Sequence, residues 1–576
     1  MQSMILRSQE WFDGRPDHSF EHRSSMRAMG HLPESYMGKP IIGIFNSWND
    51  FTNCNLPHKQ LVEYVKRGVL MAGGYPMEMH SISTPSDFMK PSDLPYRNLM
   101  SMDIEEMIRS LPIDGAIHLC ECDKTTPAQL MAAASCDIPA IQLAAGHRAS
   151  AYMQGKAVNY GTDTWKYLDD YNAGLVSEQQ WQELETNISC SLGGCPVMGT
   201  ASTMKSLSEM LGMMLPGTAS IPAHHAARYA AAEMTGRRIV EMVREGLHPS
   251  LLMTEAAFHN AIKLLAALGG SSNAVIHLTA IAGRLGIRLG LDAYADQSRN
   301  VPLLVNLQPS GIYNMDQFHV AGGIGAAIKQ LLPLLDCSAL AATGKTIAEE
   351  YGQYEVYSPE VIASLDQPVK EFSGFVVFRG SLAPDGAILK RAASSLNFDR
   401  FIGKAVVFED YADMLARIND DDLDVREDSV LLMKNCGPIG AGMPEWGMIP
   451  IPNKLLKLGV RDMVRISDAR MSGTSYGTVI LHASPESALG GPLAIVQDGD
   501  EIEVDLPNGI INLRVDDKTM EDRLARWQAP SSPHKRGFMR IYEDQVLQAH
   551  EGCDFWSLRP KDRSEVKLVP PIVGRG

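Results

Sequence analysis

Residues 114–127 read Asp114-Gly115-Ala116-Ile117-His118-Leu119-Cys120-Glu121-Cys122-Asp123-Lys124-Thr125-Thr126-Pro127, and this stretch decides the fold of the first half of the chain. Residues 115–119 form a bounded, mostly apolar run that is typical of a short strand. A helix is expected to follow, with Thr126 as its N-cap and Pro127 at its first position. The loop between them carries two thiols, two carboxylates and a lysine within five residues. Because ligands of open α/β sheets bind at the carboxyl ends of strands, this loop is the first candidate for a functional site.

Outward from this stretch, apolar runs alternate with helix-forming segments. Residues 41–45 are apolar on both faces, as in a buried parallel strand, and a helix is expected at about 58–72. Another buried strand is expected at 138–144, and helices dominate from about 200 to 350. This alternation predicts an α/β fold with a doubly wound N-terminal domain and added helices.

The chain is too long for one hydrophobic core, and its pattern divides it into two expected domains, residues 1–365 and residues 366–576. Ser358-Pro359-Glu360 predicts the start of one more helix before the boundary. The second part is richer in strands, and its best-marked pair is a hairpin over 501–515 that turns at Asn508-Gly509. We therefore expect a smaller, strand-rich, β-barrel-like C-terminal domain.

The bulk composition is that of an ordinary globular protein, with 45% hydrophobic and 21% charged residues. The net charge of −16 argues against nucleic acid or an anionic membrane surface as the main partner. No stretch reaches the ~18 uninterrupted apolar residues of a membrane span. Arg7 lies where a signal peptide needs an apolar run. We expect a cytoplasmic protein, in which metal or catalytic roles for the nine cysteines outrank disulfides.

Three loops of the first domain each place a cysteine beside small or polar residues: Asn53-Cys54-Asn55, Glu121-Cys122-Asp123 and Gly193-Gly194-Cys195-Pro196. None has the short paired spacing of a structural zinc site. If the three cysteines meet, they do so through folding, as in an iron–sulfur site held by widely spaced thiolates. Three thiolates would leave one iron open to substrate, but spacing alone leaves this hypothesis open.

Oxygen ligands and a lysine lie beside one of these cysteines. The Asp123 carboxylate suits magnesium, whereas the Lys124 ammonium would repel it, so Lys124 either binds an anion or is chemically modified. A surface salt bridge between the two is the alternative. In the second domain, two glycine-rich loops carry Glu445, which could reach a metal, and Ser472, which could be an exposed hydroxyl. Ordinary tight turns are the alternative for both loops.

Four motifs resemble, in the same order, those of the dihydroxy-acid dehydratase and 6-phosphogluconate dehydratase family. They are Cys122-Asp123-Lys124-Thr125-Thr126-Pro127-Ala128, Met198-Gly199-Thr200-Ala201-Ser202-Thr203-Met204, Gly442-Met443-Pro444-Glu445 and Ser467-Asp468-Ala469-Arg470-Met471-Ser472-Gly473-Thr474. The resemblance runs over nearly the whole chain. Leu6-Arg7-Ser8 with Trp11, and residues 161–167, are similar to the sugar-acid (aldonate) branch, which includes L-arabonate and D-xylonate dehydratases.

The resemblance implies an enzyme, a hydro-lyase that converts a sugar acid, a pentonate or hexonate, to the 2-keto-3-deoxy acid. It implies that Cys54, Cys122 and Cys195 hold an iron–sulfur cluster, with 2Fe-2S favoured and 4Fe-4S as the alternative. The open iron of that cluster would act as a Lewis acid on the C3 hydroxyl of the substrate.

The resemblance also implies Mg²⁺, held by Asp123, Glu445 and Lys124, with the lysine carried as a carbamate. Carbamylation would turn a repelling cation into an anionic oxygen ligand. Ser472, as an alkoxide, would take the C2 proton. The small-molecule substrate would lie between the two domains of a homodimer or homotetramer.

Two positions depart from the family pattern. Ser86 stands where the family usually supplies a glutamate as a further magnesium ligand, and the neighbouring Asp87 is the candidate substitute. Glu121 stands beside the expected cluster where a glycine is common. The alternatives to an aldonate dehydratase are a dihydroxy-acid dehydratase of branched-chain amino acid biosynthesis, a 6-phosphogluconate dehydratase, and an iron–sulfur-binding protein without turnover.

Overall fold

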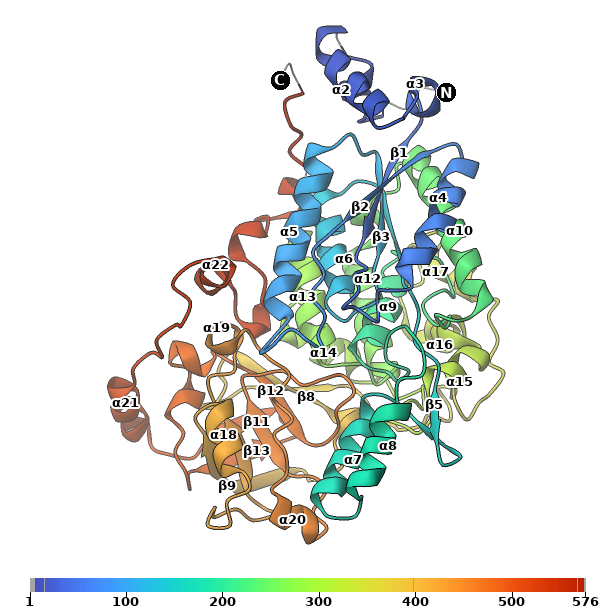
Figure 1. Cartoon of the computed structure of the whole chain (residues 1–576). Coiled ribbons are helices and arrows are strands. Elements are labelled where there is room, and N and C mark those ends of the chain that lie inside the picture. Colours follow the sequence, from blue (N-terminus) through green and yellow to red (C-terminus); the bar gives the residue numbers. More distant parts are fainter. Residues whose placement is uncertain (1–5, 15, 397, 567, 574–576) are drawn as a thin grey trace.

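The computed structural model describes residues 6–14, 16–396, 398–566 and 568–573. It has a four-stranded sheet between residues 41 and 143 and an eight-stranded sheet between residues 375 and 513 (Figure 1). We call residues 41–351 the N-terminal lobe and residues 375–513 the C-terminal lobe. The predicted boundary at 365/366 falls between them, and that division into domains stays a prediction.

The N-terminal sheet is parallel throughout, in the order β2-β1-β3-β4. Its strands are β1 (Ile41–Asn46), β2 (Tyr75–His80), β3 (Gly115–Leu119) and β4 (Ala140–Leu143). Figure 1 shows α4 (His58–Met71) and α10 (Ala226–Glu245) on one side of the sheet, and α5 (Leu94–Ser110) and α6 (Thr125–Cys136) on the other. Because helices cover both faces, β1, β3 and β4 are buried along their whole length. The predicted doubly wound α/β fold is confirmed.

Added helices complete the N-terminal lobe. Three of them are buried over most of their surface: α9 (Thr200–Met210), α12 (Glu255–Ala267) and α13 (Asn273–Arg284). The others are α7 (Thr162–Asn172), α8 (Glu178–Asn187), α11 (Pro249–Leu252), α14 (Leu291–Ser298), α15 (Met315–Val320), α16 (Gly323–Leu331) and α17 (Ile347–Tyr351), with a small hairpin of β5 (Ala151–Met153) and β6 (Lys156–Val158). α13 packs against α6 and α9, so these helices form a core next to the sheet.

The C-terminal lobe is built on one mixed sheet in the order β14-β13-β9-β10-β11-β12-β8-β7. Its strands are β7 (Phe375–Phe378), β8 (Gly386–Lys390), β9 (Arg400–Phe408), β10 (Val430–Met433), β11 (Val464–Ser467), β12 (Val479–Ser484), β13 (Glu501–Asp505) and β14 (Ile510–Leu513). A bridge between Arg379, just after β7, and Ile510 joins the two edges of the sheet. The sheet is therefore nearly closed, and the predicted barrel-like architecture is confirmed.

Two hydrophobic clusters cover the two faces of this sheet. Phe378, Leu432 and Val504 belong to the cluster on one face. The other face packs against α18 (Tyr411–Arg417) and α20 (Asn453–Lys457). Strands buried on both faces are expected to be rich in Val, Ile and Leu, as β10 is.

The predicted hairpin is confirmed, whereas two local predictions are wrong. β13 pairs with β14 from Ile502–Leu513 to Asp505–Ile510, and Gly509 supplies a positive φ of 62° in the turn. α6 begins at Thr125, and Lys124 occupies its N-cap position. Thr126 therefore lies inside the helix and is not the N-cap. The helix expected at Ser358 is only a turn, because Ile362 leaves it at once to form a bridge with Val305.

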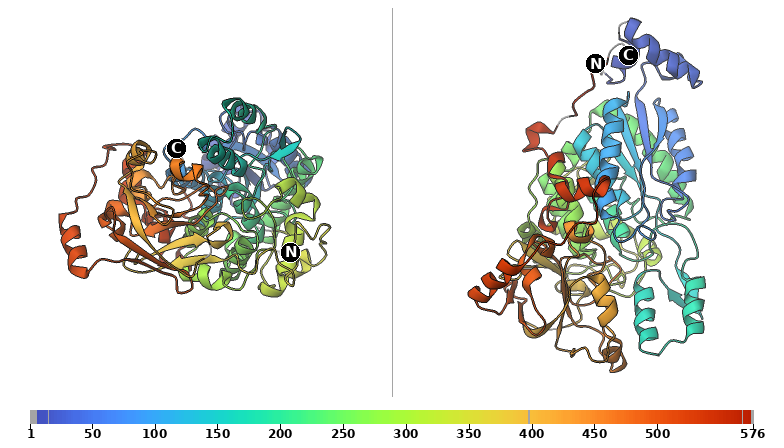
Figure 2. Two further views of the ribbon diagram at one scale, coloured as in Figure 1. Left: turned by 90° about the horizontal axis from the view of Figure 1, so that it is seen from below. Right: turned by 60° about the vertical axis from the view of Figure 1, so that its left-hand side comes forward.

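A C-terminal segment ties the two lobes together. We call residues 538–559, which begin with α22 (Phe538–Gln545), the strap; Figure 2 shows it beside the junction of the lobes. Arg97 of α5 donates a hydrogen bond of 2.8 Å to the carbonyl of Cys553, and Gln548 donates one of 2.7 Å to Glu486 of the C-terminal lobe. The strap thus contacts both lobes through buried polar groups.

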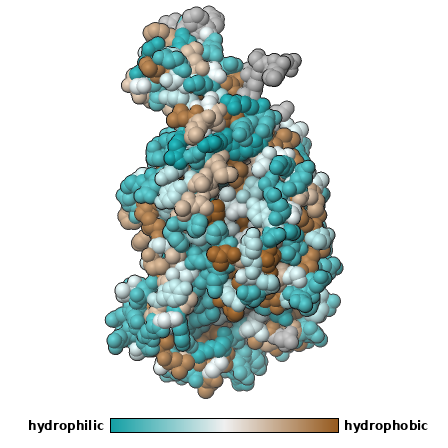
Figure 3. All heavy atoms as spheres, turned by 90° about the vertical axis from the view of Figure 1, so that its right-hand side faces the viewer, coloured by the Kyte–Doolittle hydropathy of each residue, from teal (hydrophilic) through white to brown (hydrophobic). Residues whose placement is uncertain are grey.

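The N-terminal helices α1 (Gln9–Phe12), α2 (Pro16–Ala28) and α3 (Pro33–Tyr36) project beyond the parallel sheet (Figures 1 and 2). The remaining helices are α19 (Pro438–Ala441) and α21 (Asp517–Arg526). Figure 3 shows hydrophobic residues scattered among hydrophilic ones on the face that it presents. Within the described ranges, no helix has the length and apolar content needed to cross a membrane.

Candidate active site

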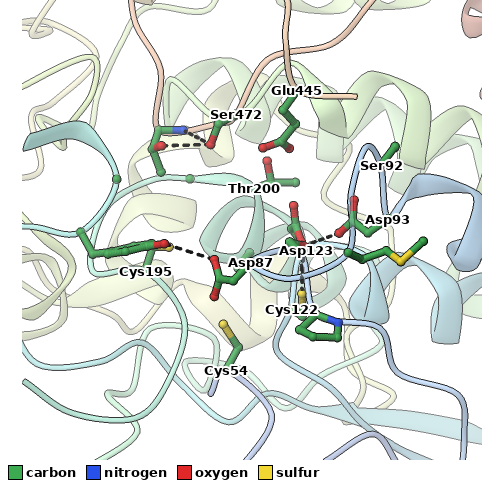
Figure 4. A pocket seen from close by; sticks show the side chains of 18 of the residues that line it. Cys54, Asp87, Ser92, Asp93, Cys122, Asp123, Cys195, Thr200, Glu445 and Ser472 are labelled. Atoms are coloured by element: carbon green, nitrogen blue, oxygen red, sulfur yellow. Dashed lines mark hydrogen bonds between the residues drawn. The ribbon is translucent and has the colours of Figure 1, made fainter. Parts of the chain in front are cut away.

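One cavity of about 580 Å³ lies where loops of the two lobes face each other. Its lining includes seven of the eight predicted site residues: Cys54, Asp87, Cys122, Asp123, Cys195, Glu445 and Ser472 (Figure 4). The eighth, Lys124, is 3% exposed and contacts Asp123. Cys54 and Cys122 follow β1 and β3, so the cavity opens at the carboxyl ends of the parallel strands, as an open α/β sheet predicts.

Backbone contacts fasten the three cysteine loops to one another. The side-chain oxygen of Asn55 accepts hydrogen bonds from the backbone N–H groups of Glu121, at 2.8 Å, and Cys122, at 3.3 Å. The Gly193 N–H donates to the carbonyl of Asn53 at 3.2 Å. Gly193 has a φ of 119°, and a Cβ there would lie 2.7 Å from the carbonyl oxygen of Gly146, so only glycine fits. Local contacts therefore hold Cys54, Cys122 and Cys195 around one space.

Burial raises the pKa of all three thiols. It raises the pKa of Cys54 and Cys122 well above the ordinary value and raises the pKa of Cys195 to about 11. The Arg148 guanidinium opposes this effect at Cys54 and Cys195. Burial therefore favours the neutral thiol over the thiolate, which is the form that binds a metal.

A buried cluster of charges lies on the other side of Cys122. The Lys124 ammonium contacts Asp123 and lies 3.4 Å from Asp93 and 3.8 Å from Glu445. Arg470 pairs with Asp93 at 2.8 Å and with Glu445 at 2.5 Å. Three carboxylates thus surround two cations.

The pKa values follow from these contacts. Burial alone would raise the pKa of Asp123, but Lys124 and Arg470 more than offset it and lower the pKa. Burial and the nearby Arg470 would lower the pKa of Lys124, but the three carboxylates raise it. Among the described residues, no three His, Cys, Asp or Glu side chains already surround a common ion position. The carboxylates converge on the ammonium instead.

The structure places Ser86, which stands at the expected glutamate position, and its neighbour Asp87, the candidate substitute, on different sides of the cavity. The Ser86 hydroxyl lies 2.8 Å from Asp123 Oδ1, also contacts Asp93, and lies 3.6 Å from the Cys122 sulfur. Asp87 instead accepts a hydrogen bond of 3.1 Å from the Tyr160 hydroxyl. In Figure 4, Asp87 lies between Cys54 and Cys195, on the sulfur side of the cavity.

Ser472 reaches the cavity from the C-terminal lobe, in the loop after β11. Its Oγ lies 2.9 Å from Thr474 Oγ1 and accepts a longer contact of 3.4 Å from the Thr474 N–H. Trp165 of α7 donates its indole N–H to the same Thr474 oxygen at 3.1 Å. A Cβ on Gly473 would lie 2.5 Å from the backbone nitrogen of Thr200, so glycine lets this loop approach the start of α9.

Glu121 and Lys205 form an ion pair of 2.5 Å behind the thiols, and both side chains are completely buried. The second Glu121 oxygen accepts the Gly146 N–H at 2.8 Å. Gly194 leaves room for this carboxylate, because a Cβ there would lie 2.3 Å from it. The unusual residue at position 121 thus has a specific partner and a specific space.

Sequence reasoning missed several residues that line the cavity or lie beside it. Asp93 and Lys205 belong to no motif that was singled out, and Asp93 reads as a helix cap because α5 begins directly after it. Tyr411 and Trp446 form a stacked aromatic pair on the cavity wall, with ring centres 4.0 Å apart. Only the position of Trp446 directly after Glu445 could have indicated its place.

Two sequence profiles together match most of the chain. Dihydroxy-acid/6-phosphogluconate dehydratase N-terminal matches residues 39–350, and dihydroxy-acid/6-phosphogluconate dehydratase C-terminal matches residues 360–553. The chain belongs to the dihydroxy-acid/6-phosphogluconate dehydratase family. It is therefore an enzyme, a dehydratase of the hydro-lyase class, and the predicted family is confirmed.

Named relatives align over nearly their full lengths. The L-arabinonate dehydratase of Rhizobium leguminosarum bv. trifolii is 46% identical, over 95% of this chain and 95% of the relative. The 6-deoxy-6-sulfo-D-gluconate dehydratase of Pseudomonas putida is 43% identical over 98% of each chain. A dihydroxy-acid dehydratase of Ignicoccus hospitalis is 37% identical, over 93% of this chain and 98% of the relative. The chain is thus similar to dehydratases of sugar acids and, at lower identity, to a dihydroxy-acid dehydratase.

Proposed function

We propose that this enzyme dehydrates an aldonate, a pentonate or hexonate, to the 2-keto-3-deoxy acid. The observation that carries the proposal is the single cavity lined by three thiols, a carboxylate cluster and Ser472 from the opposite lobe. The 46% identity to an L-arabinonate dehydratase, against 37% to a dihydroxy-acid dehydratase, supports the sugar-acid branch. The aromatic pair Tyr411 and Trp446 supports it too, because aromatic faces pack well against the C–H faces of a polyol chain.

Cys54, Cys122 and Cys195 are the residues that would hold an iron–sulfur cluster, 2Fe-2S or 4Fe-4S. Local contacts hold their loops around one space and all three thiols line the same cavity, so this donor set fits the group. Asp123, Glu445 and a carbamylated Lys124 would hold Mg²⁺; the Lys124 ammonium now occupies the point at which the carboxylates converge, so they fit a cation. When bound, the cluster and magnesium supply Lewis acidity for the leaving C3 hydroxyl and for the carboxylate and C2 hydroxyl of the substrate.

The residues of the chain then have defined tasks. Ser472 Oγ, as the alkoxide, takes the C2 proton as the C3–O bond breaks, and this proton passes to the departing hydroxide, so that water leaves and the alkoxide is restored. The enol then moves its hydroxyl proton to C3 and becomes the 2-keto-3-deoxy acid. A free serine hydroxyl is a poor base, so its alkoxide needs positive surroundings. The Thr474 N–H points to Ser472 Oγ, and the Gly473 backbone packs against the N-terminus of α9, where helix dipoles favour negative charge. Trp165, by donating to Thr474 Oγ1, leaves the threonine hydroxyl hydrogen free to point to Ser472.

A panel of acids tests the proposal on protein purified and kept without oxygen. It contains L-arabonate, D-xylonate, D-gluconate, 2,3-dihydroxyisovalerate and 6-phosphogluconate, and 2-keto acid formation is the readout. We expect turnover of at least one aldonate, with a kcat/KM at least tenfold above the values for 2,3-dihydroxyisovalerate and 6-phosphogluconate. Preference for dihydroxyisovalerate or 6-phosphogluconate would replace the proposal with the corresponding family activity. Location in the cytoplasm and assembly into a homodimer or homotetramer stay predictions from the sequence.

A further inference from the structure

The family resemblance implies a glutamate at position 86, where this chain has Ser86, and a different carboxylate lies in the adjoining space. Asp93 lies seven residues further along the chain, at the start of α5, and contacts the Ser86 hydroxyl. We propose that Asp93 is the oxygen ligand that replaces the missing glutamate and completes the magnesium site of this enzyme. This inference rests on the proposed function, because it concerns the metal that the proposed reaction uses.

The conformation of Asp93 is the first argument. Asp93 occupies the N-cap position of α5, where an aspartate normally accepts hydrogen bonds from the backbone N–H groups of the first turn. Its side chain makes no such bond, and Ser92 Oγ accepts the Leu94 N–H at 3.2 Å instead. The Asp93 carboxylate is turned toward Asp123 and lines the cavity (Figure 4). Giving up a cap costs about 1 kcal/mol, so another interaction must hold it there.

The contacts of Asp93 are the second argument. One carboxylate oxygen lies 2.8 Å from Arg470 and 3.4 Å from the Lys124 ammonium, and the other contacts Ser86 Oγ. Each oxygen has two lone pairs, so the oxygen that contacts Ser86 Oγ keeps one for a metal. The same Ser86 hydroxyl lies 2.8 Å from Asp123, a predicted ligand. The Ser86 hydroxyl therefore lies between Asp93 and Asp123, and its one hydrogen is donated to one of the two carboxylates at a time.

The charge pattern is the third argument. The Lys124 ammonium is a cation of this chain that already sits among the carboxylates of Asp93, Asp123 and Glu445. Carbamylation would remove its positive charge and add a negative one. The cluster would then hold four anionic groups against Arg470 alone, an excess that a divalent cation offsets.

Asp87 is the competing candidate and is less well placed. Its carboxylate accepts a hydrogen bond of 3.1 Å from the Tyr160 hydroxyl and lies beside Cys54 and Cys195 in Figure 4. Asp93, by contrast, lies 3.4 Å from the Lys124 ammonium and contacts the Ser86 hydroxyl, which lies 2.8 Å from Asp123. Asp87 thus lies on the side of Cys54 and Cys195, whereas Asp93 lies on the side of Asp123 and Lys124.

Metal binding without substrate tests this assignment. Mn²⁺ serves as the probe for the magnesium site, and its dissociation constant is measured from the loss of the free-ion EPR signal in anaerobic holoenzyme. Asp93→Asn keeps the shape of the side chain and removes its charge. Asp87→Asn is the competing variant, and Asp296→Asn, in an exposed ion pair with Arg299 at 2.9 Å, is the matched surface control. Thermal melting of each variant checks that it is folded.

We expect Asp93→Asn to weaken Mn²⁺ binding at least tenfold and the two other variants to change it less than twofold. Adding Ser86→Glu to Asp93→Asn should restore the dissociation constant to within about threefold of the parent, because the family arrangement is then rebuilt. This rescue separates loss of a ligand from damage to the fold. An unchanged affinity in Asp93→Asn, a larger loss in Asp87→Asn, or a folded double variant without rescue would overturn the assignment. If the parent enzyme binds no Mn²⁺ and turns over without magnesium, the metal dependence in the proposed function fails instead.

Discussion

Replacing Lys205 with methionine should destabilise the enzyme far more than the loss of any surface ion pair. Lys205 and Glu121 are both fully buried and lie 2.5 Å apart, and among the described residues no other cation lies within ion-pair distance of the Glu121 carboxylate. Removing one partner of such a pair leaves an uncompensated buried charge, which costs about 3–5 kcal/mol. Glu121 would also lose the orientation in which it accepts the Gly146 N–H at 2.8 Å.

The location of the pair predicts a second effect on the thiols. Glu121 precedes Cys122, and its carboxylate fills the space that Gly194 leaves beside Cys195. A displaced carboxylate would move two of the three cysteine loops, so Lys205→Met should also lower the iron bound per chain after anaerobic reconstitution. Lys166→Met is the matched control, because Lys166 is half-exposed and lies 3.7 Å from Asp163, an arrangement worth at most about 1 kcal/mol.

Urea unfolding followed by circular dichroism, together with iron analysis, measures both effects. We expect Lys205→Met to lose about 3–5 kcal/mol in the free energy of unfolding and most of its iron, and Lys166→Met to lose neither. Combining Glu121→Gln with Lys205→Met should recover at least half of the lost stability, because no charge is then left unpaired. A Lys205→Met enzyme with the stability and iron content of the control would refute the reasoning.

Three further predictions concern single positions. Ser472→Ala should lower kcat by about 10²–10⁴ while leaving iron content and visible absorption unchanged; unchanged turnover would exclude the serine as the base. Gly473→Ala should lower the melting temperature and kcat together, because the added Cβ would lie 2.5 Å from the Thr200 nitrogen; an unaltered melting curve would contradict the tight approach. Burial and, after it, Asp468 raise the pKa of Glu486 from 4.5 to about 7. The folded protein therefore keeps a proton that the unfolded chain releases, so this group favours folding most at low pH, and stability falls by up to about 3 kcal/mol as pH rises through 7. Glu486→Gln should reduce the difference between urea midpoints at pH 5 and pH 8, and an equal difference in both proteins would refute the shift.

Much of the fold could be predicted because buried strands appear in the sequence as runs of apolar residues. Residues 41–45 and 115–119 become β1 and β3, since strands covered on both faces need apolar side chains at successive positions. The prediction failed where a single contact overrides local preference. Ile362 ends the helix expected at Ser358 by bridging to Val305, a residue 57 positions earlier in the sequence, which no local pattern announces.

The sequence predicted which residues form the site but not the contacts that position them. Family motifs singled out Cys122, Asp123, Glu445 and Ser472, and all four line one cavity. The motifs could not indicate how the loops are fastened, because that depends on Asn55, whose side chain accepts two backbone N–H groups from a distant segment. Nor could they indicate Asp93, whose sequence signal is that of an ordinary helix cap.

The two departures from the family pattern have the same physical logic. A carboxylate buried without a partner would cost several kcal/mol, and one removed from a metal site would leave a ligand position empty. Glu121, an added carboxylate, is matched by Lys205 from α9 and by the space at Gly194. Ser86, where a carboxylate is missing, is matched by Asp93 from the start of α5. In each case the compensating residue is a neighbour in space but not in sequence, so the effect of a changed ligand position follows from the side chains around it. By this reasoning the proposed magnesium site would keep its full set of carboxylates, with Asp93 in place of the glutamate that the resemblance implies at position 86.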